Sequence, residues 1–126
     1  MNPETRVQVE DVMSSPLETI SKDATVQEAA ERMCDEDISA LVVTTHPPSI
    51  VTSTDVLEVA AENRSAGDVP VTDVMTESVE TVPPEIYLEE VAAMMTTFGI
   101  KHLPVTDEDD EYVGMISSTD VTEQLS

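Results

Sequence analysis

Basic residues are scarce in this sequence: 5 lysines and arginines stand against 27 aspartates and glutamates, for a formal net charge of −22. Proteins bind the phosphates of nucleic acids chiefly through lysine and arginine, and anionic lipid surfaces attract the same residues. The acidic residues are spread along the whole chain and do not form a tail. We therefore exclude nucleic acid and membrane surfaces as partners.

Cysteine and long apolar runs are also lacking. The single cysteine, Cys34, excludes an intramolecular disulfide, and its place in an expected helix predicts a small buried thiol. No apolar run approaches the roughly 18 residues that a membrane-spanning helix needs. Residues 1–4 lack the basic and then apolar pattern of a signal peptide. These absences predict a cytoplasmic protein.

Two explanations can account for so much acid. Disorder is opposed by the 40% of residues that are apolar and fall in periodic segments. The other explanation is adaptation to very high salt, where the Debye length falls to about 3 Å at 1 M and self-repulsion is screened. We therefore expect an acidic protein of a halophilic archaeon.

An internal repeat is the strongest pattern in the sequence. The segment 52–56 returns as 117–121, and the Asp-Val-Met of residues 11–13 returns at 73–75. Three extra residues in the second copy fall in the acidic region 107–112. Because a repeated unit that cannot bury its apolar face alone stacks on its copy, the two copies predict one domain. We assign 1–63 to repeat 1, 64–72 to a linker and 73–126 to repeat 2.

Each copy is expected to fold as β-α-β-β-α. Apolar residues recur with helical spacing in each copy, and these stripes are Val26, Ala29, Ala30 and Met33, then Leu88, Val91, Ala92 and Met95. The expected strands are 17–20, 38–44, 50–52, 79–82, 101–106 and 112–117, and further helices start near residues 53 and 118. The fold class is therefore α/β (α+β), with two repeats packed with pseudo-two-fold symmetry.

The repeated stretch at the start of each second helix allows two interpretations. Thr52 with Asp55, and Ser117 with Asp120, have the spacing of a capping box, which satisfies unpaired N–H groups at a helix start. A helix start that directly follows a strand is also an anion site, with N–H donors and the positive end of the helix dipole. The hydroxyls of Thr52 and Thr54 would add donors to phosphate, and Asp55 could accept two hydrogen bonds from a ribose diol.

Two β-α-β-β-α copies, each opening with Asp-Val-Met and closing on Ser/Thr-x-Thr-Asp, resemble a tandem pair of cystathionine β-synthase (CBS) domains, a Bateman module. The resemblance covers about residues 9–123. The segment 114–120, Gly-Met-Ile-Ser-Ser-Thr-Asp, is close to the family pattern. Ser49 stands where the family has glycine, which predicts a distorted turn in the first copy. Family members bind AMP, ATP or S-adenosylmethionine, or have no known ligand.

The resemblance also implies which residues contact a ligand. Asp55 and Asp120 would hold the ribose hydroxyls, and the residues facing phosphate would be Thr52, Thr54, Ser117 and Thr119. Backbone near Ile20, Val82, Ser39 and Lys101 would line the adenine clefts. Basic residues stand at the start of the second strand only in the second copy, as Lys101 and His102, so the site with Asp120 is the better candidate for a charged ligand. His102 is equally compatible with a half-exposed strand residue.

Two hypotheses of different classes remain. In the first, the module binds an adenosyl ligand and signals to a separate effector protein, with AMP or cationic S-adenosylmethionine asking for fewer basic partners than ATP. In the second, it is a ligand-free interaction module, and the Ser/Thr-x-Thr-Asp motifs are only helix caps. The helix stripes leave room for a homodimer. We expect no catalytic residues, no required cofactor and no metal site, and we interpret the acidic run 107–111 as a solvated turn.

Overall fold

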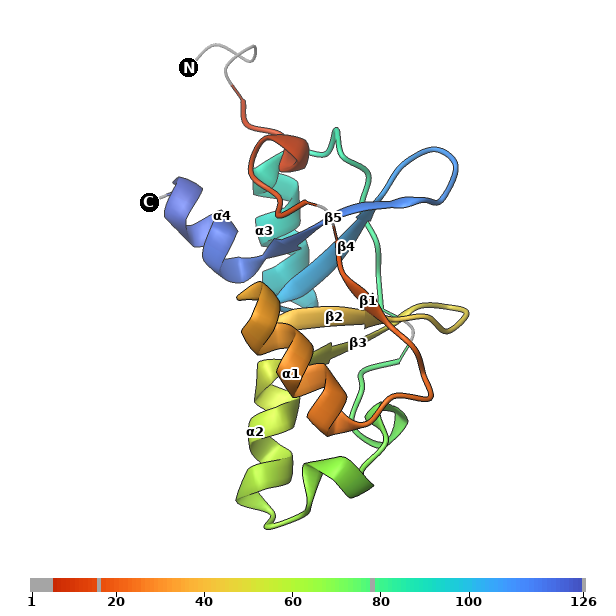
Figure 1. Ribbon diagram of the computed structural model, residues 1–126. Helices are drawn as coiled ribbons and strands as arrows, with labels where there is room; N and C mark the ends of the chain where they lie inside the picture. Colours follow the sequence, from red (N-terminus) through yellow and green to blue (C-terminus); the bar gives the residue numbers. More distant parts are fainter. Residues whose placement is uncertain (1–5, 16, 78, 126) are drawn as a thin grey trace. The chain divides into compact units, whose positions relative to one another are not determined.

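The computed structural model describes residues 6–15, 17–77 and 79–125, and the chain forms two compact units. The central unit comprises Glu18–Val79, and the C-terminal unit combines Met1–Leu17 with Glu80–Ser126. Figure 1 colours the chain from the red N-terminal segment to the blue C-terminal helix. Among the described residues, no helix has the length and apolar character that crossing a bilayer requires.

The central unit has the β-α-β-β-α order that the sequence predicts for the first copy. Its elements are β1 (Thr19–Ile20), α1 (Val26–Glu36), β2 (Ala40–Val43), β3 (Ser49–Thr52) and α2 (Ser53–Ala61). The strands form one sheet in the order β1-β2-β3, with β1 parallel and β3 antiparallel to β2. The pairing of β2 with β3 is regular through Ser49, so this residue does not disturb the ladder itself. Ser49 is buried, and its hydroxyl lies 2.7 Å from that of Thr45.

The C-terminal unit repeats this order with one strand fewer. Its elements are α3 (Leu88–Phe98), β4 (His102–Thr106), β5 (Tyr112–Ser117) and α4 (Ser118–Leu125). β4 and β5 form an antiparallel pair with an irregularity between Val105 and Thr106, next to the turn that carries the extra residues. Gly99 ends α3 in the left-handed conformation that glycine adopts at low cost.

The strand expected at 79–82 is wrong, because Val82 forms only an isolated parallel bridge to Val105. In the central unit, the N–H of Val42 donates to the carbonyl of Glu18 at 3.1 Å, which adds a rung to the β1–β2 ladder. Pro104 takes the place of Val42 in the second copy and has no N–H to donate. Val82 keeps its own two bonds, to the carbonyl of Pro104 and from the N–H of Thr106, at 3.1 and 3.0 Å.

The compact units do not coincide with the sequence repeats, because each unit is completed by the first residues of the other repeat. The N–H of Val9 donates to Ile86 at 2.9 Å, and Val9 is fully buried in the core of the C-terminal unit. Ile50 of β3 exchanges backbone bonds of 2.9 and 2.8 Å with Thr76 in the same way. The segment 64–72, expected as a linker, buries Val69 and Val71 in the central unit. The apolar side chains of these two valines give the segment 64–72 a structural role.

The helical stripes face the cores of their own units. Val26, Ala29 and Met33 of α1 are buried in the central unit, and Leu88, Val91 and Met95 of α3 are buried in the C-terminal unit. Cys34 is exposed, so the expectation of a buried thiol is wrong. It follows Met33 directly, and a step of one residue turns a side chain about 100° around the helix, away from the stripe.

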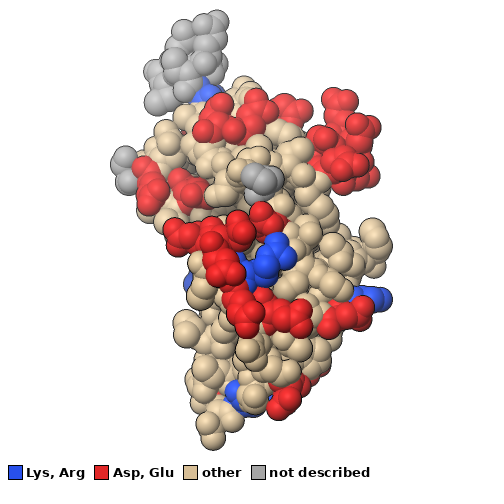
Figure 2. Space-filling view, viewed as in Figure 1, with Lys and Arg blue, Asp and Glu red and all other residues tan. Residues whose placement is uncertain are grey.

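Acidic side chains are scattered over the face shown in Figure 2, with basic side chains at only a few places. The ion pairs among the described residues join Arg6 to Glu89, Arg32 to Glu18, and Arg64 to both Glu62 and Asp73. They are partly exposed, and such surface pairs contribute roughly 0–1 kcal/mol each. With 5 basic residues in the sequence against 27 acidic ones, the basic side chains are too few to pair with most of the carboxylates.

Gly114 of β5 lies against Met13 and Ser14. Substituting it tests how tightly this N-terminal segment packs in the C-terminal unit. A Cβ at this position would lie 2.5 Å from Sδ of Met13 and 2.8 Å from the carbonyl oxygen of Ser14. We expect Gly114→Ala to lower the free energy of unfolding by about 1–3 kcal/mol, because the backbone atom cannot move away easily. Urea denaturation in molar KCl measures this change.

Gly67→Ala is the matched control for Gly114→Ala. The nearest atom to a Cβ there is Oε1 of Gln27, the mobile end of a side chain, at 2.8 Å. The free energy of unfolding of the Gly67→Ala variant should change little. Equal losses from the two substitutions would contradict a tight contact at Gly114.

Candidate functional site

In the central unit, the start of α2 holds the first of the two repeated motifs. Thr52 is the N-cap residue of α2, and its Oγ1 accepts a hydrogen bond from the N–H of Asp55 at 3.4 Å. Oδ2 of Asp55 accepts in return from the N–H of Thr52 at 2.9 Å and from its hydroxyl at 3.2 Å. The two side chains form a complete capping box, and the Asp55 carboxylate is held at the helix start by both contacts.

The start of α4 in the C-terminal unit has the same construction. The N–H of Ser117 donates to Oδ2 of Asp120 at 3.0 Å, and the N–H of Asp120 donates to Oγ of Ser117 at 3.2 Å. Ser117 and Asp120 are half-buried, whereas Thr119 is exposed on the first turn, as Thr54 is in α2. Both motifs therefore form the capping hydrogen bonds that their spacing predicts.

A second backbone bond anchors each helix start to the neighbouring strand. The N–H of Ser53 donates to the carbonyl of Ser39 at 2.9 Å, and the N–H of Ser118 donates to that of Lys101 at 2.8 Å. With the capping bonds, two of the first three amides of each helix have partners within the protein. These helix starts are consequently poorer anion sites than the sequence suggests, and the amide of Thr54 or Thr119 lies between the two that are engaged.

The structure brings Lys101 and His102 close to the Asp120 motif through the β4–β5 pairing. His102, the first residue of β4, pairs with Ser117, the last residue of β5. His102 is half-buried and Lys101 is exposed. Burial lowers the pKa of His102 below its ordinary value, with the Asp120 carboxylate raising it and Lys101 lowering it by smaller amounts. This corner carries both signs of charge, and the corresponding corner of the central unit has Ser39 and Ala40 instead.

Ile20 and Val82 lie farther along the sheets than the helix starts. Ile20 pairs with Val43, three residues along β2 from Ala40, whose partner is Thr52. Val82 bridges Val105, three residues along β4 from His102. Because strands rise about 3.3 Å per residue, each apolar residue is displaced about 10 Å along the strand direction from its capping motif. It also lies on the other side of the intervening strand, β2 or β4. In each unit, a buried apolar residue and a carboxylate thus lie near the two ends of that strand, on opposite sides of it.

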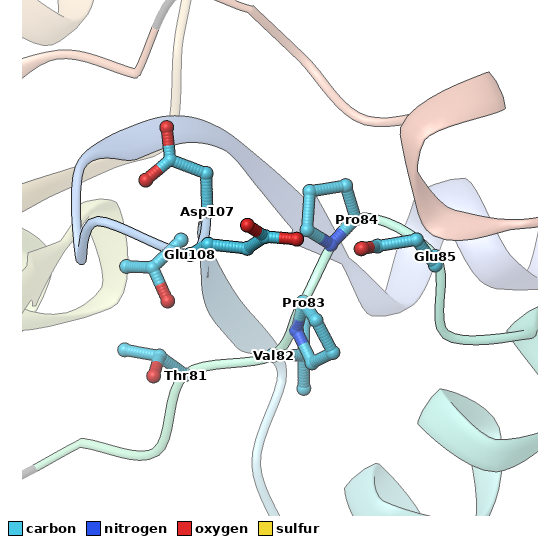
Figure 3. A pocket seen from close by; sticks show the side chains of 8 residues that line it. Thr81, Val82, Pro83, Pro84, Glu85, Asp107 and Glu108 are labelled. Atoms are coloured by element: carbon cyan, nitrogen blue, oxygen red, sulfur yellow. The ribbon is translucent and has the colours of Figure 1, made fainter.

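The structure also has a pocket that the sequence analysis did not predict. It lies at the other end of β4, between residues 81–85 and 106–108, and has a volume of about 170 Å³. Figure 3 shows the two prolines, Pro83 and Pro84, on one side and Asp107 and Glu108 on the other. The Asp107 side of this pocket was expected to be only a solvated turn. No group of three His, Cys, Asp or Glu residues that could hold a metal occurs among the described residues.

Comparison with known proteins identifies the repeated unit. The CBS domain family model matches residues 9–62 and 71–126. Homoserine O-acetyltransferase of Methanococcus vannielii is 29% identical over 94% of this chain, and L-aspartate semialdehyde sulfurtransferase of Methanosarcina acetivorans is 30% identical over 94%. The chain spans only about a quarter of the length of these two relatives, 25% and 24%. The CBS domain-containing protein YhcV of Bacillus subtilis is 29% identical, covering 90% of this chain and 81% of its own.

Solved structures match over almost the whole chain. A hexameric CBS-CP12 protein from bloom-forming cyanobacteria has a TM-score of 0.89 and 28% identity, covering 98% of this chain and 74% of its own. The CBS domain pair of protein MJ0100, solved in complex with 5′-methylthioadenosine and S-adenosyl-L-methionine, has a TM-score of 0.82 and 25% identity. That match covers 95% of this chain and 96% of the other.

The capping motif of α4 leads to a stability prediction. Ser117→Ala removes the N-cap hydroxyl that binds the N–H of Asp120, and such losses cost about 1 kcal/mol. We expect urea denaturation to show a decrease of this size. Thr119→Ala, at the exposed second position of the same helix, should have a much smaller effect. If Thr119→Ala lowered the free energy of unfolding as much as Ser117→Ala, the lost capping bond would not be the cause of the destabilisation.

The pKa of His102 leads to a prediction about pH. Because its pKa in the folded protein lies below the ordinary value of about 6.5, the unfolded chain binds a proton first as the pH falls. The free energy of unfolding should therefore decrease from pH 6.5 down to the lower folded pKa. We expect wild type to lose more stability than His102→Gln between pH 7.5 and pH 5 in urea titrations. Parallel losses in the two proteins would rule out this contribution.

Proposed function

Because the chain belongs to the CBS domain family, we propose that it is a regulatory module that binds an adenosyl ligand and signals to a separate partner protein. The observation that carries the proposal is the Asp120 carboxylate, held at the start of α4 beside His102 and Lys101. An ionised carboxylate has about four acceptor positions, so one that caps a helix can still accept a hydrogen bond from a ribose hydroxyl.

The residues around Asp120 are compatible with an adenosyl ligand. Val82 bridges Val105, three residues along β4 from His102, and would contact the adenine. Ser117 and Thr119 would face a phosphate or another substituent at the 5′ position. Lys101 offers the positive charge that a phosphate needs, and the central unit has Ser39 in that place. We infer that a charged ligand binds the C-terminal unit, and that Ile20, Thr52, Thr54 and Asp55 of the central unit take a less charged one. Protein MJ0100, similar in fold, is solved with two adenosyl compounds, which supports the same ligand class.

A ligand-free interaction module is the second candidate, and a specific observation favours it. Both aspartates already serve the protein as capping groups, so their presence needs no ligand to explain it. Under either function we propose a homodimer. Its interface would not use the apolar stripes of α1 and α3, because these face the cores of their own units. Exposed apolar side chains available for contact elsewhere are Leu57, Phe98 and Leu125.

Titration calorimetry in molar KCl tests the proposal with 5′-methylthioadenosine, S-adenosylmethionine, AMP and ATP. We expect at least one of them to bind wild type and Asp120→Ala to weaken its affinity about tenfold or more, because a hydrogen bond to a charged group contributes roughly 1.5–3 kcal/mol. No binding of any of the four compounds would favour the interaction module.

Asp11→Ala is the matched control for loss of a cap. Oδ2 of Asp11 accepts from the N–H of Gln8 at 3.0 Å in a capping box of the same unit, at the short helix Val9–Asp11. Both substitutions should lower stability, and only Asp120→Ala should weaken ligand binding. An equal loss of affinity in the two variants would show that destabilisation alone accounts for the effect.

A further inference from the structure

The pocket at the end of β4 has walls that backbone hydrogen bonds hold in place. The N–H of Thr106 donates to the carbonyl of Val82, the N–H of Ile86 to that of Pro83 at 3.3 Å, and the N–H of Glu10 to that of Pro84 at 3.0 Å. Both prolines also have fixed φ angles. On the opposite wall, Oδ1 of Asp107 accepts from the N–H groups of Asp109 and Glu111 at 2.9 and 3.0 Å. The pocket is therefore formed before any partner arrives, which reduces the ordering cost of binding.

The charge of the pocket is negative and is not balanced within the protein. Its lining includes Glu85, Asp107 and Glu108 and has no lysine or arginine. Figure 3 shows Glu85 and Glu108 extending toward Pro84 from opposite sides. Within the described part of the chain, the ion pairs go to other carboxylates, namely Glu18, Glu62, Asp73 and Glu89. Three acidic residues thus surround an apolar wall made of Val82, Pro83 and Pro84.

We propose that this pocket is a docking site for an arginine side chain from a partner protein. Its volume of about 170 Å³ is below the roughly 300–1,000 Å³ of small-molecule sites and is of the size of a single side chain. A guanidinium is planar, donates to two carboxylate oxygens at once and is less strongly hydrated than an ammonium. It therefore suits a site in which carboxylates border proline rings better than lysine does.

The first copy of the repeat has a different chemistry at the corresponding positions. The two copies are offset by 62 residues here, as Met13 and Met75 are. The segments 83–85 and 106–108 therefore correspond to Ser21-Lys22-Asp23 and Thr44-Thr45-His46. Lys22 replaces a proline and His46 replaces Glu108, so the negative charge is specific to the C-terminal unit. The pocket is at the opposite end of β4 from Asp120 and shares Val82 with the proposed adenosyl site. None of its three acidic residues belongs to that site, so the proposal does not depend on binding of an adenosyl ligand.

The probe for this site is N-acetyl-arginine amide, which mimics an arginine within a chain. Titration into the ¹⁵N-labelled full chain in 0.3 M KCl should give saturable amide shifts at residues 81–86 and 106–111, and none at 21–23 or 44–46. N-acetyl-citrulline amide, which has nearly the same shape without the charge, should give no shifts. N-acetyl-lysine amide should bind several-fold more weakly. Free L-arginine should also bind more weakly, because the pocket repels its carboxylate.

Two double variants with the same change in net charge separate the pocket from the general field of the protein. Glu85→Gln with Glu108→Gln removes two lining carboxylates and should weaken binding of the arginine amide about tenfold or more. Asp109→Asn with Asp110→Asn removes two carboxylates of the same turn outside the lining and should change the affinity less than twofold. Asparagine tolerates the positive φ of 60° at residue 110.

Three results would overturn the proposal. The first is an equal loss of affinity in the two double variants, which would show a diffuse electrostatic attraction. The second is equal binding of the arginine and citrulline compounds. The third is a Ca²⁺ titration that shifts the same amides at lower concentration than the arginine amide does, which would identify a cation site. Unchanged amide dispersion in each variant establishes that the fold is intact.

Discussion

The junction between a strand and the following helix is the constraint on which both units depend. In each unit, a hydroxyl residue ends the strand and an aspartate three residues later closes a capping box. The first amide of each helix, that of Ser53 or Ser118, donates to the carbonyl of the residue before the neighbouring strand, which is Ser39 or Lys101. These bonds set the direction of the helix relative to the sheet, and they place a carboxylate at the corner where the proposed ligand binds. Cap and candidate site are therefore the same atoms, so any function at this corner is coupled to local stability.

The two units use this shared construction with different chemistry. The central unit has a full three-stranded sheet and neutral residues beside its aspartate, whereas the C-terminal unit has a two-stranded sheet with Lys101 and His102. Pro104 removes one rung of the ladder in the C-terminal unit, and Pro83 and Pro84 then form one wall of the pocket. One end of β4 thus carries mixed charge and the other carries only negative charge. Two copies of one repeat can in this way present unlike surfaces to ligands and partners.

Acidity has separate consequences for the surface and for the sites. With 5 basic residues against 27 acidic ones, few carboxylates can be paired, and the pairs that form are partly exposed. Self-repulsion of this kind destabilises a compact state unless salt screens it. The cores are accordingly aliphatic and fully buried, as at Leu41, Leu88, Leu103 and Ile116. The proposed binding sites are the few positions where a basic residue or an apolar wall stands beside the acid.

The repeat, the helical stripes and the capping boxes were predictable from the sequence, because each depends on residues within a few positions of one another. Helix periodicity placed Val26 and Met33 inside, and the spacing of Ser117 and Asp120 predicted their mutual hydrogen bonds. Tertiary structure alone decided what depends on distant partners. Val9 completes the core of the second repeat, Pro104 shortens a strand more than 20 residues before it in the chain, and the 81–85 segment meets Asp107 to form a pocket. Local patterns encode which face of an element is apolar, whereas chain connectivity and packing decide what that face meets.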